Sequence, residues 1–389
     1  MLNEILDNAI NNVNFYRKNV LCTNGKKLTI QDFPIVERKN IQINFKDFLN
    51  SSIQNVNILE TSSSGSSGNP LSVYWVNNDY MKSMYTLWKR RSKYYGITPY
   101  SKKIDFTYET LDATKWYSIT ENSISVSRMI IDDHNKLEEL FDLMNKFMVE
   151  WMYIQPYVAK KIIDYIIKYN AIVPKSIKYI ESVGEILSEE IRVLLYKVFK
   201  CPVANMYGSE EMNGIAYECP YHNMHILMDN VYLETEYKNE GNVYITNLHN
   251  YLMPFIRYKQ GDVISMTAGK NCPCGSNEPI IETILGRSYE QIKINNHLVN
   301  PYVLITIVEK INSSVENIIR NYKFVFDKST ENLTVMLSIE NNNKMFEKII
   351  KQALIEELQN WGFDRSKIIV KFFEKILLKT KKNSVLEII

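Results

Sequence analysis

Apolar residues recur three or four positions apart in several stretches of the chain. The first stretch runs from Leu2 to Val13 and predicts a helix over residues 1–20. The same spacing predicts further helices over 79–96, 135–149, 156–169 and 186–199. Short apolar segments at 176–182 and 202–206 flank the last of these helices, an order of strand, helix and strand that is typical of a parallel sheet. We therefore expect an α/β fold.

The pattern changes after residue 230. Alternating segments at 231–237 and 242–248, joined around Gly241, predict two antiparallel strands. A new set of elements then follows Gly286, with helices near 301–312 and 343–360 and strands near 318–327, 332–339 and 367–373. We expect a large N-terminal domain with parallel and antiparallel strands over 1–285, and a small α+β C-terminal domain over 286–389.

Composition excludes several classes of function. The chain has 389 residues and a formal net charge of +2, which gives no reason to expect a nucleic-acid partner. Its apolar runs are far shorter than the ~20 residues that span a membrane. The acidic residues Glu4 and Asp7 lie where a signal peptide is basic. We therefore expect a cytoplasmic protein without a membrane span.

A segment rich in hydroxyl groups and glycine follows residue 60. Its residues are Ser63, Ser64, Gly65, Ser66, Ser67 and Gly68. Glycines allow successive backbone N–H groups to converge on an anion such as phosphate, and serine hydroxyls add donors. The spacing differs from that of a P-loop, and a flexible Ser/Gly linker is the alternative interpretation.

Five short motifs follow one another along the chain in a characteristic order. They are Ser63–Pro70, Gly184-Glu185, Tyr207–Glu211, Arg257–Asp262 and Gly286-Arg287. Each is weak alone, but their order and separation resemble those of the adenylate-forming enzymes. The resemblance is strongest to the phenylacetate–CoA ligase-like branch, which includes capsule-biosynthesis and coenzyme-modifying relatives. It implies a mobile C-terminal domain that acts as a lid.

The resemblance also implies an activity. ATP would activate a small carboxylic acid as an acyl adenylate, and the acyl group would pass to coenzyme A with release of AMP and pyrophosphate. An acyl carrier-protein thiol, an amine or a hydroxyl remains open as the acceptor. The alternative is a degenerate relative that binds nucleotide or acyl ligand without full turnover. The sequence leaves the oligomeric state open, a homodimer included.

Roles for individual residues follow from the same resemblance. The Ser63–Gly68 segment would hold the β- and γ-phosphates of ATP. Gly184 and Glu185 would border the adenine, with Tyr207 and Gly208 next to it. Glu211 would bind Mg²⁺, which prefers carboxylate and phosphate oxygens. Two further residues contact the nucleotide in this assignment: Asp262 would accept hydrogen bonds from the ribose hydroxyls, and Arg287 would reach phosphate or ribose.

The chain departs from the family pattern at several positions. Asn69 replaces a lysine in the serine segment, and Tyr289 occupies the position of a hinge aspartate. The catalytic lysine expected near the C-terminus aligns with Asn383 or Ser384. The neighbouring lysines, Lys381 and Lys382, are therefore the candidates for its role, with Lys293 as the next candidate. These departures motivate the degenerate alternative.

A second group of residues has the composition of a metal site. Cys219 and His225 lie in one segment, and Cys272 and Cys274 form a Cys-Pro-Cys-Gly element about fifty residues later. Three thiols and one imidazole suffice for a closed tetrahedral Zn²⁺ site. His222 competes with His225 for the fourth position, and the resemblance favours His225. Ordinary reduced cysteines in a loop are the alternative.

Overall fold

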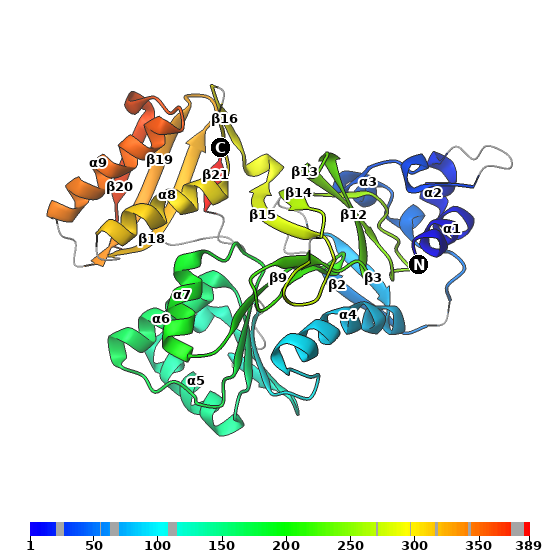
Figure 1. Ribbon diagram of the computed structural model, residues 1–389, viewed down its shortest axis with the longest axis horizontal. Helices are drawn as coiled ribbons and strands as arrows, with labels where there is room; N and C mark the ends of the chain where they lie inside the picture. The colour runs from blue at the N-terminus through cyan, green and yellow to red at the C-terminus, as the bar shows by residue number, and fades with distance from the viewer. Residues whose placement is uncertain are drawn as a thin grey trace. The chain divides into compact units, whose positions relative to one another are not determined.

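The structure is a computed structural model. It describes residues 1–20, 27–54, 56–62, 70–107, 115–269, 271–295, 297–315, 318–340, 344–374 and 385–389, without the side chain of Tyr289. These residues form two compact units (Figure 1). The first comprises 1–260 and 265–282, and the second comprises 261–264 and 283–389. The expected domain boundary at residue 286 stays a prediction.

A large mixed sheet, most of whose residues belong to the first unit, forms the framework of that unit. Its central strands are parallel and lie in the order β9 (Val203–Ser209), β8 (Tyr179–Val183), β7 (Trp151–Ile154), β4 (Lys103–Thr107) and β6 (Ser123–Ser127). The antiparallel strand β5 (Tyr117–Ile119) follows β6. Beyond β9 the sheet continues through β10 (Asn213–Glu218), β11 (Met224–Ile226), β15 (Ile280–Arg287), β14 (Tyr258–Thr267), β13 (Glu240–Asn247) and β12 (Val231–Tyr237). The predicted antiparallel pairing of the two segments after residue 230 is confirmed as β12 with β13.

Helices cover both faces of the parallel strands (Figure 1). One face carries α5 (His134–Phe147), α6 (Pro156–Tyr169) and α7 (Glu189–Phe199), and the other carries α4 (Asn77–Tyr95). Local signals set their ends: Asp133 and Ser188 cap α5 and α7, Pro156 opens α6, and Gly96 ends α4 in a left-handed conformation. The four helices predicted from periodicity are confirmed.

The N-terminal segment differs from the prediction of one helix over 1–20. It forms α1 (Leu2–Asn12) and α2 (Asn14–Asn19), separated by Val13 in an extended conformation. Val13 forms an isolated β-bridge with Asn50, and this distant pairing interrupts the helix. The described residues before α4 also form the strands β1 (Val36–Glu37), β2 (Ile58–Ser62) and β3 (Ser72–Val76), the α-helix α3 (Arg38–Ile43) and two short 3-10 helices, Ile30–Asp32 and Phe45–Phe48.

The second unit is a small α+β structure. Its sheet has the order β20 (Ile368–Phe372), β19 (Asn332–Ile339), β18 (Ile319–Asp327) and β21 (Leu386–Ile388). The helices α8 (Pro301–Ser314) and α9 (Lys344–Asn360) pack on it and bury an apolar core of their own. A short hairpin of β16 (Ile292–Ile294) and β17 (His297–Val299) precedes α8. None of the described helices is long and apolar enough to cross a membrane.

Candidate functional site

Two of the predicted nucleotide-binding motifs lie where the parallel pairing of two neighbouring strands ends. β8 and β9 pair in parallel up to Val183 and Met206, and the next residues are Gly184 and Tyr207. The Glu185 carboxylate accepts a hydrogen bond of 3.0 Å from the backbone N–H of Tyr157, at the start of α6. Because the carboxyl ends of parallel strands are where open α/β sheets bind ligands, this edge is the candidate nucleotide site.

The hairpin of β9 and β10 explains why glycine occupies position 208. A Cβ atom at Gly208 would lie 2.1 Å from the carbonyl oxygen of Asn213, so a side chain cannot fit there without moving the backbone. The adjacent Tyr207 is half-buried, and its hydroxyl accepts a hydrogen bond of 3.4 Å from the amide of Gln260. The close approach of the two strands therefore fixes the backbone beside Tyr207.

Glu211 lies in the turn between β9 and β10, residues 210–212, which we call the Glu211 turn. Only 4% of Glu211 is exposed. Its carboxylate accepts a hydrogen bond of 3.2 Å from the hydroxyl of Tyr258. A carboxylate held beside the candidate nucleotide edge suits Mg²⁺, a hard cation that takes one or two protein carboxylates together with phosphate oxygens.

Asp262 and Arg287 lie together in the second unit. The Arg287 Nε atom is 3.6 Å from Oδ1 of Asp262, and Asp262 is 7% exposed. Gly261, which precedes the aspartate, has φ of +98°, a conformation that favours glycine. The structure thus brings these two predicted nucleotide ligands into one ion pair.

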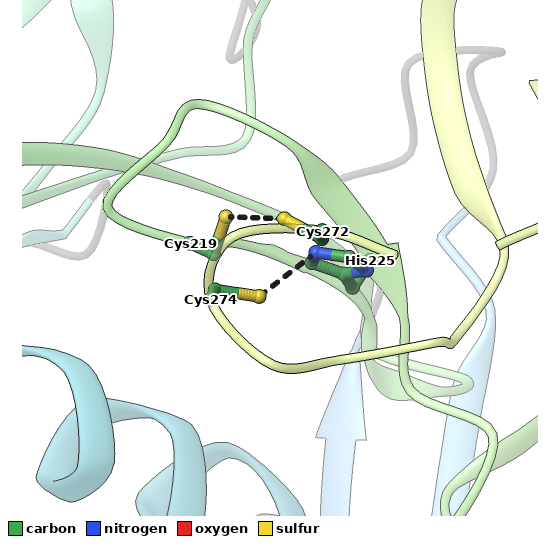
Figure 2. Close-up of side chains that lie close together, drawn as sticks. All are labelled: Cys219, His225, Cys272 and Cys274. Carbon is green, nitrogen blue, oxygen red and sulfur yellow. Dashed lines mark hydrogen bonds between the residues drawn. The ribbon is translucent and has the colours of Figure 1, made fainter. Parts of the chain in front are cut away.

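The four predicted metal ligands converge in the first unit (Figure 2). Cys219 follows β10, His225 lies on β11, and the two other cysteines lie in the loop before β15. The Sγ atoms of Cys219 and Cys272 are 3.8 Å apart, and all four ligand atoms lie within 4.8 Å of one another. Two sulfur ligands at about 2.3 Å from a tetrahedral Zn²⁺ are separated by about 3.8 Å, so the spacing fits this ion.

Neighbouring groups orient this cysteine–histidine cluster. Nδ1 of His225 lies 3.2 Å from the carbonyl oxygen of Glu278 and can only donate to it, which leaves the Nε2 lone pair directed at the thiols, 3.3 Å from Cys274 Sγ. A carbonyl that fixes the tautomer of a histidine in this way is characteristic of metal sites. The Tyr94 hydroxyl, on α4, donates to Cys274 at 3.7 Å.

Two thiols of the cluster, those of Cys219 and Cys272, have strongly perturbed pKa values. Burial raises the pKa of the Cys219 thiol to about 12. Burial also acts to raise the pKa of Cys272, but hydrogen bonds, the largest of them from the Cys274 backbone, outweigh it and lower this pKa to about 6. One thiol is therefore prepared to ionise, and a cation would favour the thiolate form of the others.

His222 lies outside the cluster. Its backbone adopts φ of +60° in the turn that follows Cys219, and 62% of its side chain is exposed. Its Nδ1 atom lies 3.3 Å from the Glu218 carboxylate and 3.2 Å from the Arg192 guanidinium. The geometry therefore selects His225 and not His222 as the fourth candidate ligand.

Several predicted site residues lie outside the described residues. They are Ser63, Ser64, Gly65, Ser66, Ser67 and Gly68 of the serine segment, and Lys381 and Lys382 near the C-terminus. The strands on either side of the serine segment are described: β2 and β3 pair antiparallel, with Ser62 opposite Ser72. Lys293 lies on β16 in the second unit.

Sequence reasoning missed residues that contact the Glu211 turn. Tyr258 belongs to the Arg257–Asp262 motif, and its hydroxyl donates a hydrogen bond to the Glu211 carboxylate, a contact that the motif does not indicate. The sequence motifs include neither Asn247 nor Asn230. Both are fully buried, and their side-chain amides donate to the backbone carbonyl oxygens of Glu211 and Met212, respectively. Asparagines inside apolar segments are a weak signal, because such residues are mostly exposed unless their amides are paired.

We compared the sequence and the structure of the chain with those of known proteins. No family model matches the chain. Protein CapK of Staphylococcus aureus is 23% identical over 354 residues, which cover 85% of this chain and 75% of CapK. The structure of 2-hydroxyisobutyryl-CoA ligase in the postadenylation state with R3-HIB-AMP has a TM-score of 0.78 at 13% identity, over 100% of this chain and 87% of that chain.

The same ligase in complex with 2-HIB-AMP and CoA matches with a TM-score of 0.60 at 14% identity, over 100% of this chain and 88% of that chain. The anthranilate CoA ligase AuaEII with anthranoyl-AMP matches with a TM-score of 0.63 at 12% identity, over 86% of this chain and 66% of that chain. At such identities the likeness shows the fold, and the predicted α/β fold class is confirmed. The chain has the fold of the adenylate-forming ligases.

Proposed function

We propose that the protein is an AMP-forming carboxylate ligase. It activates a small carboxylic acid with Mg·ATP as an acyl adenylate and then transfers the acyl group, with coenzyme A as the favoured acceptor. The observation that carries this proposal is the Glu211 turn: a buried carboxylate lies in the turn that directly follows β9, four residues after Tyr207, in a fold shared with ligases solved with AMP conjugates of their acids. The complex of one such ligase with CoA supports the choice of acceptor.

The chemistry requires positioning of anions. A carboxylate oxygen attacks the α-phosphate of ATP while pyrophosphate leaves, so two negatively charged groups must be held together. Gly184, Glu185, Tyr207 and Gly208 border the base, and Asp262 accepts hydrogen bonds from the ribose hydroxyls. Arg287, paired with Asp262, adds a cation near the ribose or phosphate. Glu211 holds Mg²⁺, which supplies positive charge to the phosphates when it is bound.

Two further parts of the proposal rest on sequence. The Ser63–Gly68 segment, which connects β2 to β3, holds the β- and γ-phosphates. Lys381 or Lys382 places a cation at the α-phosphate during adenylation. Replacing both, as Lys381→Ala with Lys382→Ala, should strongly reduce acid-dependent pyrophosphate release but leave AMP affinity unchanged; full activity of this variant would refute the lysine assignment.

We also propose that the cysteine–histidine cluster binds one structural Zn²⁺. Four protein ligands, whose ligand atoms lie within 4.8 Å of one another, would fill a tetrahedral coordination sphere and leave no open position for a substrate, which separates structural from catalytic zinc. Cys219 and His225 come from one segment and Cys272 and Cys274 from another, so the ion fastens the loop before β15 to the β10–β11 hairpin. Metal binding then contributes directly to folding.

Pyrophosphate release measured over a panel of carboxylic acids tests the activity. Release that depends on ATP, Mg²⁺ and one class of acid is the expected result. A protein that binds ATP or AMP in calorimetry but releases no pyrophosphate with any acid would instead be the degenerate relative, the alternative that Asn69, Tyr289 and Ser384 motivate. A protein that binds neither nucleotide would contradict both.

A further inference from the structure

Buried asparagines from outside the hairpin hold the Glu211 turn. Asn247, the last residue of β13, donates from Nδ2 to the carbonyl oxygen of Glu211 at 3.0 Å. Asn230 donates from Nδ2 to the carbonyl oxygens of Met212 and Gly214, at 2.9 and 2.5 Å. Both asparagines are 0% exposed. These hydrogen bonds therefore hold the backbone of Glu211 and of the residues that follow it, Met212 and Gly214.

The other end of the Asn247 amide connects the turn to the segment before β14. Oδ1 of Asn247 accepts hydrogen bonds from the backbone N–H groups of His249 and Asn250, at 2.8 and 2.9 Å. This segment leads to Tyr258, whose hydroxyl donates to the Glu211 carboxylate. One stretch of chain thus holds both the backbone of Glu211, through Asn247, and its side chain, through Tyr258.

Asn230 connects the same turn to α4. Its Oδ1 atom accepts a hydrogen bond of 2.8 Å from the hydroxyl of Ser83, a buried residue of that helix. The Ser83 hydroxyl in turn accepts one of 3.0 Å from the amide of Asn213, which follows the turn. The turn is therefore held against α4 on one side and against the end of β13 on the other.

We propose that Asn247 and Asn230 are positioning residues that fix the Glu211 carboxylate for a divalent cation bound to the nucleotide phosphates. The inference rests on the proposed function, in which Glu211 is a metal ligand. Neither asparagine contacts the carboxylate, and each acts through the backbone of the turn. Groups that orient a metal ligand without touching the ion affect metal affinity, because a displaced ligand must be reordered when the ion binds.

Asn247→Asp separates this role from general stability. The aspartate has the same shape and keeps the acceptor for His249 and Asn250, but it places an oxygen opposite the Glu211 carbonyl oxygen. Asn312→Asp is the matched control. Asn312 is also buried, lies on α8, donates to the carbonyl oxygen of Ile319 at 3.5 Å and accepts from its N–H at 2.8 Å.

The measurement is ATP affinity by calorimetry at a series of Mg²⁺ concentrations, with AMP affinity measured in the absence of Mg²⁺. In Asn247→Asp, a higher Mg²⁺ concentration should be needed to reach half of the Mg²⁺-induced increase in ATP affinity. We expect this concentration to rise by about tenfold or more, the scale found when groups around a metal ligand are changed. AMP affinity should remain that of the wild type. Asn312→Asp should lose thermal stability without any change in the Mg²⁺ dependence.

The possible outcomes separate this inference from the proposed function. If Glu211→Gln abolishes the Mg²⁺ effect and Asn247→Asp behaves as wild type, the positioning role is refuted and the proposed function stands. An equal shift in Asn312→Asp would also refute it, since the effect would then reflect stability. If wild-type ATP affinity is independent of Mg²⁺, the metal role of Glu211 fails and the inference fails with it.

Ser83→Ala provides a second variant, should Asn247→Asp fail to fold. It removes one hydroxyl, the partner of Asn230 and Asn213, with little change in volume. We expect a smaller shift of the Mg²⁺ dependence in the same direction, again with unchanged AMP affinity. A folded Ser83→Ala protein with the wild-type Mg²⁺ dependence would overturn the inference.

Discussion

The cysteine–histidine cluster and the Glu211 turn lie in the same unit, but their ligand atoms are held in different ways. In the cluster, four metal-binding groups from two distant segments face one another, with sulfur atoms 3.8 Å apart. In the turn, one carboxylate accepts a hydrogen bond from Tyr258, and its backbone is bound by Asn247. In the proposed function the cluster is therefore held together by an ion, whereas the turn is organised by hydrogen bonds within the protein.

This difference predicts which site controls stability and which controls reactivity. A thiol loses the favourable metal bond when its ion is removed, and thiols pair weakly with one another. The carboxylate of Glu211 has a protein partner of its own in the Tyr258 hydroxyl. The following predictions test the contrast, from the largest expected effect to the smallest.

Removal of both cysteines of the loop before β15 should have the largest effect. Cys272→Ser with Cys274→Ser should abolish zinc binding and lower the free energy of unfolding by several kcal/mol, because structural Zn²⁺ binds with apparent free energies of about 10–16 kcal/mol. Elemental analysis and thermal melts provide the two measurements. If wild-type protein purified without chelator contains no zinc, the cluster is not a structural zinc site and the contrast between the two sites fails.

The two histidines of the same segment should behave differently. His225→Ala should lose most of the zinc, since it removes one of the four ligands, the imidazole that lies 3.3 Å from Cys274 Sγ. His222→Ala should retain zinc, because the exposed imidazole of His222 contacts Glu218 and Arg192 and not the thiols. Zinc content after dialysis is the measurement, and loss of zinc from His222→Ala alone would reverse the assignment.

Glu211→Gln should affect reactivity and leave stability nearly unchanged. The amide can still accept from Tyr258, so the turn should keep its structure. Acid-dependent pyrophosphate release should fall by about 100-fold or more, the scale observed when one electrostatic group of a catalytic site is removed. AMP affinity and zinc content serve as controls. An active Glu211→Gln enzyme would show that the metal ligand lies elsewhere.

Asp262→Ala should weaken nucleotide binding by a smaller factor. Hydrogen bonds to a charged group contribute about 1.5–3 kcal/mol, so the affinity for AMP should fall by about tenfold or more. The fold should persist even though Arg287 loses its ion pair with Asp262, because half-buried guanidinium groups remain accessible to water. Calorimetry on the folded variant is the test. Unchanged AMP affinity would remove the ribose assignment.

Tyr258→Phe should have the smallest effect. It deletes only the hydroxyl that donates to Glu211 and preserves the buried ring. A loss of about 1 kcal/mol, typical of one hydrogen bond, corresponds to about a fivefold higher Mg²⁺ requirement for pyrophosphate release. The rate at saturating Mg²⁺ should approach that of the wild type. A much larger loss at saturating Mg²⁺ would indicate that Tyr258 itself takes part in the reaction.

Local patterns were sufficient to predict much of the framework. The helices α4 to α7 follow from apolar spacing, and their ends follow from Asp133, Ser188 and Gly96. The N-terminal helix was predicted wrongly as continuous, because its interruption at Val13 depends on the bridge to Asn50. Periodicity records only which face of a segment is apolar, and it carries no information about a partner 37 positions away.

The sequence by itself determined the fold class and the residue types of both candidate sites, since these depend on short motifs and local spacing. Only the tertiary structure decided between His225 and His222: strand β11 directs the first towards the thiols, while the turn exposes the second. It alone placed Asn247 and Asn230 against the Glu211 turn. Such contacts depend on how the chain packs, because an amide finds its partner across space and leaves no regular trace in the sequence.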